Sequence, residues 1–242
     1  QTLCAQSHSF APPNGRLVKF QMASAAEWCQ LDTVRFLCEL QNLDQLEDGT
    51  ARASELERLG PPAIICQELR ILVNGVVVEQ IQDFGRTVVT LNALTPTTTK
   101  IMNGMEALEL EDPYGQQARV APNAGVPTNI QEVRIQCEKY KPLAAGEKRT
   151  ISFSPAPSGL FQQAHMFPLM HGSISVKMLL ASSPKEVVVS DIAAAANGVA
   201  ARRRSERWQI TQPRLCYSSN TLSSAAQGEF DQLISGKGIV FN

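Results

Sequence analysis

The chain has 242 residues, of which 43% are hydrophobic and 19% are charged, and its formal net charge is −1. This length can bury a full core in one domain, and a net charge near zero provides no global field that would gather nucleic acid or an anionic membrane. No apolar run approaches the roughly 20 residues that a membrane-spanning helix needs, and a charged fraction below the usual value of about 25% modestly favours a surface that meets other protein.

Strand patterns dominate the first half of the chain. Residues 16–22 alternate between apolar and polar side chains, and residues 33–40 do the same, which is typical of strands with one buried face. A polar stretch with helical content follows at residues 43–60. The sequence Gly60-Pro61-Pro62 ends it, because Pro cannot continue a helix.

The clearest hairpin lies at residues 69–78, where Asn74 and Gly75 separate two runs rich in β-branched residues. Both turn residues tolerate the positive φ of a type I′ turn. A segment with a more helical pattern follows at residues 87–94. Residues 95–129, rich in Thr, Gly and Pro, form a long irregular excursion. A loop of this length inside a compact domain is typically functional or ordered by a partner.

In the second half of the chain, strand patterns lie at residues 133–137, 148–153, 173–180 and 208–217. Pro213 lies inside the last of them, which predicts an edge strand or a bulged strand. Residues 191–207 form a distinct loop between two strands. A helix is predicted at residues 223–234, with Ser223 as its cap and Gly236 just beyond its end.

Many short strands, one strong hairpin and long loops predict an all-β fold, either an antiparallel sandwich or a jelly roll. The helical pieces lie in the connections and do not alternate with strands, which argues against a parallel α/β fold. We expect a single domain over residues 1–242, with loop excursions at about 95–129 and 191–207.

The sequence carries none of the common catalytic motifs. It has no Gly-x-Ser-x-Gly elbow, no phosphate-binding Gly-rich loop that ends in Lys-Ser/Thr, and no His-Glu-x-x-His. The six cysteines are scattered without metal-ligand spacing. We expect them to be small apolar core residues in a reducing compartment, and disulfides or a zinc site are the alternative. The sequence therefore predicts no enzyme, no catalytic residue, no metal and no cofactor.

Two clusters of titratable residues are candidate ligand sites. His165 and His171 flank an apolar triplet, but a metal would need a third and a fourth ligand, which are not evident nearby. We expect these histidines to satisfy backbone groups at the rim of a barrel. The densest acidic cluster, residues 109–112, lacks the ligand spacing of a calcium loop and is interpreted as a solvated loop.

Four arginines form a candidate basic contact loop: Arg202, Arg203, Arg204 and Arg207. They could contact phosphates. Apart from Trp208, no aromatic residue is interleaved with them, so a solvated or subunit-contacting loop is favoured and contact with nucleic acid is the alternative.

The segment 158–180 is unusually apolar and carries no acid, base or nucleophile arranged for chemistry. It runs from a Gly turn through an apolar triplet and a second Gly into an alternating strand. We interpret it as a junction built for packing. Its candidate core or subunit-contact anchors are Phe161, Phe167, Pro168 and Leu169.

Four segments together resemble one known family: residues 69–86, residues 159–161 with 167–169, residues 208–216, and residues 229–236. Their order and spacing resemble the first jelly roll of the double jelly-roll major capsid proteins of polinton-like viruses, virophages and large eukaryotic DNA viruses. Related integrated genes occur in protists such as dinoflagellates. The resemblance covers roughly residues 16–242.

The resemblance implies an eight-stranded antiparallel jelly-roll sandwich with short helices in the connections. It implies a structural protein that self-assembles, as a trimer of copies of itself, and that contacts other shell proteins. Its location would be the virion, assembled in the host cytoplasm or nucleus. On this interpretation the two loop excursions lie at an end of the barrel.

The chain departs from the family pattern in two respects. It stops at Asn242, about where a second barrel would begin, and His165-Met166 stands where a basic-aromatic pair is expected. We therefore expect a fragment, a single-barrel relative such as a vertex protein, or half of a capsid gene kept by a host. Two alternative functions remain open: an intracellular, host-domesticated assembly subunit, and a cupin-like module that holds a ligand or metal inside the barrel.

Overall fold

The computed structural model describes residues 1–5, 9–11, 15–44, 55–56, 58–94, 143–155, 157–188 and 205–237. The strands are β1 Thr2–Cys4, β2 Ser9–Phe10, β3 Leu17–Met22, β4 Trp28–Asn42, β5 Cys66–Val73, β6 Val76–Gln82, β7 Lys148–Phe153, β8 Met166–Pro168, β9 Ile174–Leu180 and β10 Trp208–Asn220. The α-helices are α1 Phe84–Leu94 and α4 Ser224–Lys237, and the 3-10 helices are η1 Pro62–Ile65, η2 Leu160–Gln162 and η3 Pro184–Glu186.

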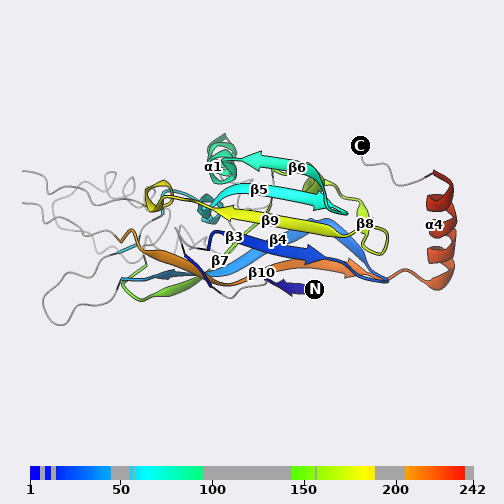
Figure 1. Ribbon diagram of the computed structural model, residues 1–242, viewed down its shortest axis with the longest axis horizontal. Helices are drawn as coiled ribbons and strands as arrows, with labels where there is room; N and C mark the ends of the chain where they lie inside the picture. Colours follow the sequence, from blue (N-terminus) through cyan, green and yellow to red (C-terminus); the bar gives the residue numbers. More distant parts are fainter. Residues whose placement is uncertain are drawn as a thin grey trace, which may run out of the picture.

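The strands form two antiparallel sheets that face each other (Figure 1). The first, which we call the β4 sheet, has the order β1-β10-β4-β7, with β2 added to β10 and β8 to β4. The second, the β5 sheet, has the order β3-β9-β5-β6.

Strand pairing identifies the fold as a jelly roll. β1 pairs with β10, β3 with β9, β4 with β7 and β5 with β6, so early strands pair with late ones in nested order. The chain is thus one long antiparallel hairpin rolled into two sheets, which is the jelly-roll arrangement. The all-β class and the jelly-roll order are confirmed. The count of eight strands, the single domain and its boundaries stay predictions.

The core is built by the alternation that the sequence predicted. In β3, Val18, Phe20 and Met22 are buried while the residues between them are exposed. The facing β4 sheet supplies Phe36, whose ring lies 5.8 Å from that of Phe20 and 5.2 Å from that of Phe153, measured between centroids. Such burial, at about 25 cal/mol per Å² of apolar surface, is the main term that stabilises the sandwich.

The predicted hairpin is confirmed as β5 and β6. Asn74 and Gly75 have φ angles of 49° and 82°, the left-handed values that a type I′ turn needs at both positions. The helical segment that follows is confirmed as α1. No helix in the described part of the chain combines the length and the apolar character that crossing a bilayer requires.

The strand at residues 208–217, predicted to be an edge strand or a bulged strand, is confirmed as the bulged strand β10, and two other local predictions need correction. β10 is bulged at Pro213, with a register shift between Thr211 and Arg214, but it lies inside the β4 sheet and not at its edge. The bulge accommodates a residue without an N–H donor. α4 does begin at its predicted cap, since the Ala226 N–H donates to Oγ of Ser223 at 3.4 Å. It continues to Lys237, however, so Gly236 lies within the helix.

The second correction concerns residues 43–60. In their described part, Leu56 and Arg58 form isolated β-bridges to Leu143 and Val188, so the helical prediction is wrong there. The predicted excursion 95–129, the acidic cluster 109–112 and the strand 133–137 lie outside the described residues.

Candidate assembly surface

One end of the sandwich gathers four connections in which Glu27 is the one Asp, Glu, Lys or Arg. These are the β3–β4 turn, the β5–β6 turn, the β8–β9 loop and the β10–α4 link, all at the end from which α4 projects (Figure 1). We define the uncharged end as the surface of residues 23–26, 74–78, 165–173 and 221–223.

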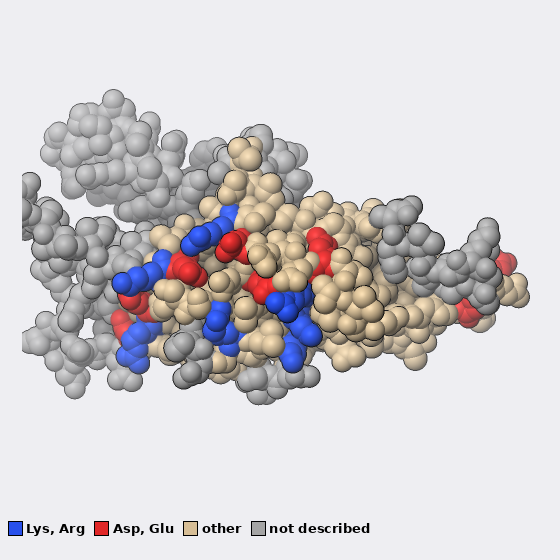
Figure 2. All heavy atoms as spheres, turned by 45° about the horizontal axis from the view of Figure 1, so that its top comes forward, with Lys and Arg blue, Asp and Glu red and all other residues tan. Residues whose placement is uncertain are grey.

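The sequence runs that build this end lack Asp, Glu, Lys and Arg. They are residues 20–26, 71–78, 150–176 and 215–228. With 19% of the chain charged, about one residue in five, a run of 27 residues (150–176) without a charge is exceptional. Figure 2 shows Lys, Arg, Asp and Glu interspersed over the middle of the described surface and few of them toward the α4 end. Depletion of charge is the compositional mark of the core of a protein–protein interface.

The uncharged end contains a shallow open depression of about 480 Å³, lined by residues 23–25, Asn74 and residues 169–173. Asn74 ties its two sides together. Its backbone N–H donates to the Ser173 carbonyl at 2.9 Å, and its side-chain Oδ1 accepts from the Ser173 N–H at 2.9 Å. The hairpin turn and the β8–β9 loop are therefore held as one surface.

Helix α4 packs on the same end through Trp28 of β4. The Trp28 ring meets Phe230 edge-on with centroids 4.3 Å apart, and its Nε1–H donates to Oε1 of Gln227 at 3.2 Å. His171 Nε2 lies 2.9 Å from Asp231 Oδ1. Both histidines were expected to satisfy backbone groups, but the partner of His171 is a side chain, that of Asp231. His165 is exposed.

The edge of the β5 sheet reaches the uncharged end at the start of β6. Val76, Val77 and Val78 are 67%, 50% and 49% exposed, which makes them three consecutive exposed apolar side chains. β6 pairs with β5 on one side and is the last strand in the order of its sheet. An exposed apolar edge strand is a site where another chain can add.

In the second half of β6, the side chain of Glu79 binds the turn at Ser158. Its Oε2 accepts from the Ser158 hydroxyl at 2.7 Å and from the Leu160 N–H at 3.2 Å, while Oε1 accepts from the Gly159 N–H at 2.9 Å. These bonds fasten the start of segment 158–180 onto β6. Charge-assisted bonds of this kind are the stronger ones in proteins.

The predicted anchors lie beneath the uncharged end. Phe161, Phe167, Pro168 and Leu169 are all buried in this chain's own interior. β8 holds two of them on the β4 sheet, where Phe167 pairs with Cys29. Their contribution to subunit contacts stays a prediction.

Of the four arginines of the predicted basic loop, the structure describes Arg207. It is exposed, and its Nη1 lies 3.9 Å from Oδ1 of Asp44. Arg202, Arg203 and Arg204 lie outside the described residues, so contact with nucleic acid stays a prediction.

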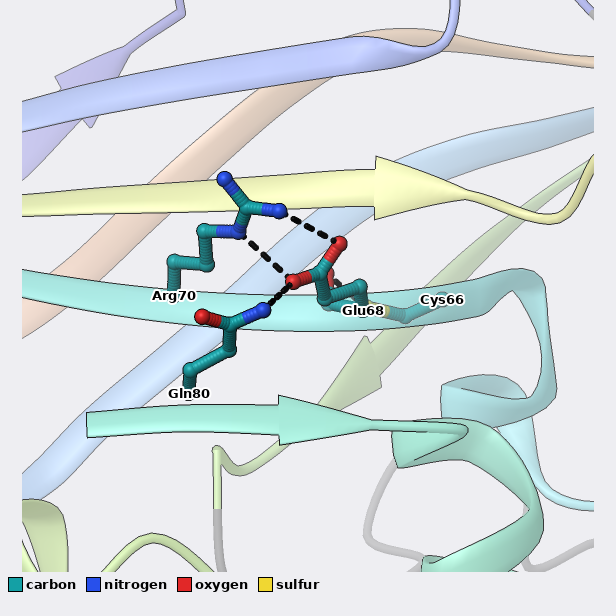
Figure 3. Close-up of polar contacts among 4 residues, drawn as sticks. All are labelled: Cys66, Glu68, Arg70 and Gln80. Carbon is teal, nitrogen blue, oxygen red and sulfur yellow. Dashed lines mark hydrogen bonds and ion pairs between the residues drawn. The ribbon is translucent and has the colours of Figure 1, made fainter.

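The outer face of the β5 sheet is charged, in contrast to the end. Strand register places Lys19 opposite Lys177 and Lys177 opposite Arg70, which gives a row of three cations across β3, β9 and β5. Figure 3 shows Arg70 turned toward Glu68, with Nε–Oε1 and Nη2–Oε2 distances of 2.6 and 3.2 Å, and Gln80 of β6 donating to the same carboxylate. The hydrogen bond to Glu68 raises the pKa of Arg70. We call this surface the charged face.

The described cysteines are free thiols. Cys29, Cys38 and Cys66 are buried, as predicted, whereas Cys4 is exposed. Burial raises the pKa of Cys29 to about 12 and raises that of Cys66 as well, so both stay protonated and neutral. Among the described residues, no group of three or more His, Cys, Asp or Glu is placed to hold a metal. The expectations of no enzyme and no cofactor stay predictions.

No family model and no curated protein matches the chain. Among solved structures, it is similar to the crystal structure of PBCV-1 VP54 fitted into a reconstruction of the virophage Sputnik, with 13% identity over 96% of this chain and 44% of that chain and a TM-score of 0.45. It is similar to a chain of the PBCV-1 virus capsid (12% identity, 95% and 44% covered, TM-score 0.41). It is also similar to the mavirus major capsid protein (14%, 93% and 47%, 0.42).

The chain spans less than half the length of each of these chains. They include a major capsid protein, the class that the four sequence segments resemble. The jelly-roll assignment rests on the strand pairing within this chain.

Sequence reasoning missed the uncharged end, the open edge at Val76–Val78, and the side chains Glu79 and Asp231. The end could have been found by the spacing of charged residues alone, because its four runs are visible in the sequence. Glu79 and Asp231 gave no signal, since their partners lie 79 and 60 positions away.

Proposed function

We propose that the chain is a structural, capsid-type subunit that self-assembles into a viral or virus-derived protein shell and works in the virion. Its partners are copies of itself, as a trimer, and other shell proteins. The observation that carries the proposal is the uncharged end: an exposed surface whose own residues include no Asp, Glu, Lys or Arg, on a jelly roll whose sequence segments resemble capsid proteins.

Folding of the chain does not require the exposed side chains on this end to be uncharged. Residues 24–26 lie at the surface or near it, where Lys or Glu would be solvated at little cost. A charge there becomes costly only when another protein covers the surface and removes its water. The depletion therefore supports contact with protein.

The cupin-like alternative needs His165 or His171 inside the barrel. Both are exposed at the uncharged end, and His171 faces Asp231 of α4. The structure gives this alternative no specific support. A host-domesticated assembly subunit would use the same surface, and it differs from the proposal in its location inside a cell.

The proposal is tested with the purified chain by size-exclusion chromatography with light scattering and by negative-stain microscopy. We expect concentration-dependent oligomers. Ala25→Glu, which places a charge on the uncharged end, should weaken association at least about tenfold, which corresponds to 1.4 kcal/mol. Ser182→Glu is the matched control, an exposed small residue beyond the other end of β9, and it should change nothing.

A strictly monomeric wild-type chain at all concentrations would overturn the proposal. So would an equal effect of Ala25→Glu and Ser182→Glu, because the end would then hold no special contact. A stoichiometric transition metal in the native protein would instead favour the ligand-binding module.

A further inference from the structure

Helix α4 rests on the uncharged end through a small part of its surface. Among its residues 224–232, whose side chains the structure describes, Gln227 and Phe230 are partly buried and the others are exposed. These two lie three positions apart and therefore share one face of the helix. Phe230 packs on Trp28 of β4, which is 7% exposed. An element held by so few buried contacts is one that opens locally at low free-energy cost.

A chain of hydrogen bonds runs from Trp28 through α4 to His171 in the β8–β9 loop. The Trp28 Nε1–H donates to Oε1 of Gln227 at 3.2 Å, and Nε2 of Gln227 donates to Oδ1 of Asp231 at 3.1 Å. The same carboxylate oxygen lies 2.9 Å from Nε2 of His171. The imidazole therefore contacts the same oxygen as Gln227, the residue that is bonded to Trp28.

Among the described residues, Asp231 is the charged group in contact with His171. The residues that line the depression beside the imidazole include no Asp, Glu, Lys or Arg. Glu27, next to the β3–β4 turn, is hydrogen-bonded to the side chain of residue 1. The other charged residues of α4 are Glu229, which is exposed, and Lys237, its last residue. The charge state of the imidazole is therefore felt first by the Asp231 carboxylate.

We propose that His171 is a pH-sensitive switch that sets how firmly α4 is docked over Trp28. Histidine is the side chain that ordinarily changes its charge between about pH 5 and 8. A protonated imidazole attracts the Asp231 carboxylate and keeps the helix docked. This attraction is lost as the pH rises through the titration of the imidazole, so α4 opens more often at the higher pH and exposes Trp28 on the uncharged end. The switch operates within one copy of the chain and does not depend on the proposed function.

Hydrogen exchange of the α4 amides at about pH 6 and about pH 8, on either side of the usual histidine titration, tests the switch. Each rate is divided by the intrinsic rate of an unstructured peptide at the same pH, and the protein is kept dilute enough to stay monomeric. The side chains of His171 and Asp231 are 29% and 49% exposed. We therefore expect α4 to be roughly twofold to fivefold less protected at the higher pH, the range for exposed ion pairs. The protection of β4 should be the same at both.

Three variants identify the titrating group. His171→Gln keeps a hydrogen-bond donor beside Asp231 but takes up no proton, so the protection of α4 should have one value at both pH values. Asp231→Asn should abolish the pH dependence as well, because it removes the carboxylate charge. His165→Gln is the matched control, since His165 is another exposed histidine of the uncharged end, and this variant should keep the wild-type pH dependence.

Each outcome decides for or against the switch. A wild-type helix with equal protection at both pH values would overturn it. So would a His171→Gln chain that keeps the wild-type difference, or a His165→Gln chain that loses it, because another group would then titrate. A difference that disappears in His171→Gln and Asp231→Asn but persists in His165→Gln would establish the switch. None of these results bears on the proposed function, which is tested by association.

Discussion

The charged face and the uncharged end belong to the same strands, yet their side chains affect the stability of the fold differently. β9 starts at the uncharged end and, three residues on, carries Lys177 between Lys19 and Arg70. Like charges opposite each other destabilise a sheet, so this row is expected to lower the stability of the fold, an effect that solvation by water keeps small. The residues of the uncharged end have no such repulsion among them, and they also lack the charges that exposed turns commonly carry. The difference is the one expected if, as proposed, the charged face meets solvent and the uncharged end meets protein.

The largest expected effect lies beneath the uncharged end. Phe167 is 2% exposed, so Phe167→Ala should lower the free energy of unfolding by about 3–5 kcal/mol through lost burial and a cavity. Urea denaturation measures the loss. Leu222→Ala, on the same end but 40% exposed, is the control and should change stability by less than about 0.5 kcal/mol. If Phe167→Ala had near-normal stability but no longer assembled, Phe167 would act at an interface and not in the core.

The second effect tests the carboxylate at the border of the two regions. Glu79→Gln keeps the shape but removes the charge that accepts from Ser158, Gly159 and Leu160. We expect a loss of about 1.5–3 kcal/mol, the range for hydrogen bonds to charged groups. Glu68→Gln on the charged face should cost less than Glu79→Gln, because its Arg70 partner is about half exposed to solvent. Equal losses in urea denaturation would show that Glu79 does not fasten the segment.

The strand framework was predictable because its signals are local. Alternation in β3 and in the middle of β4 follows from one buried face per strand, and Asn74-Gly75 allows few backbone conformations other than the tight turn observed. These features need no knowledge of distant residues. The same holds for the cap at Ser223, where the bond spans three positions.

The candidate site was less predictable because its contacts are long-range. The Glu79–Ser158 bond and the His171–Asp231 pair join residues far apart in the chain. Pro213 predicted either an edge strand or a bulged strand. The choice between the two depends on which strands lie beside β10, and the local sequence does not contain that information. The end of α4 was missed because Gly236 is a frequent helix terminator that here lies inside the last turn.

A third effect concerns how α4 is attached to the uncharged end. Phe230→Ala removes the edge-on contact with Trp28, which as an aromatic pair contributes about 0.5–1.5 kcal/mol beyond its buried area. Hydrogen exchange of the α4 amides should accelerate while that of β4 is unchanged. Glu229→Ala, on the exposed side of the same helix, provides the control. If both variants exchange at the wild-type rate, Phe230 does not anchor the helix.

The smallest effect has the opposite sign and lies on the charged face. Lys177→Glu converts two like-charge neighbours, Lys19 and Arg70, into two opposite pairs. Cross-strand pairs contribute roughly 0.2–1 kcal/mol each, so the variant should be more stable than the wild type, and Lys177→Gln should fall between them.

Salt separates this electrostatic gain from a packing effect. At 1 M salt the Debye length falls to about 3 Å, so the stability difference between Lys177→Glu and the wild type should shrink. Oligomer formation should be unaffected, because the charged face meets solvent. A Lys177→Glu chain that is less stable than the wild type would contradict the expected electrostatic gain. A Lys177→Glu chain that no longer assembles would show that the cationic row contacts an acidic partner. The two surfaces would then be two kinds of interface.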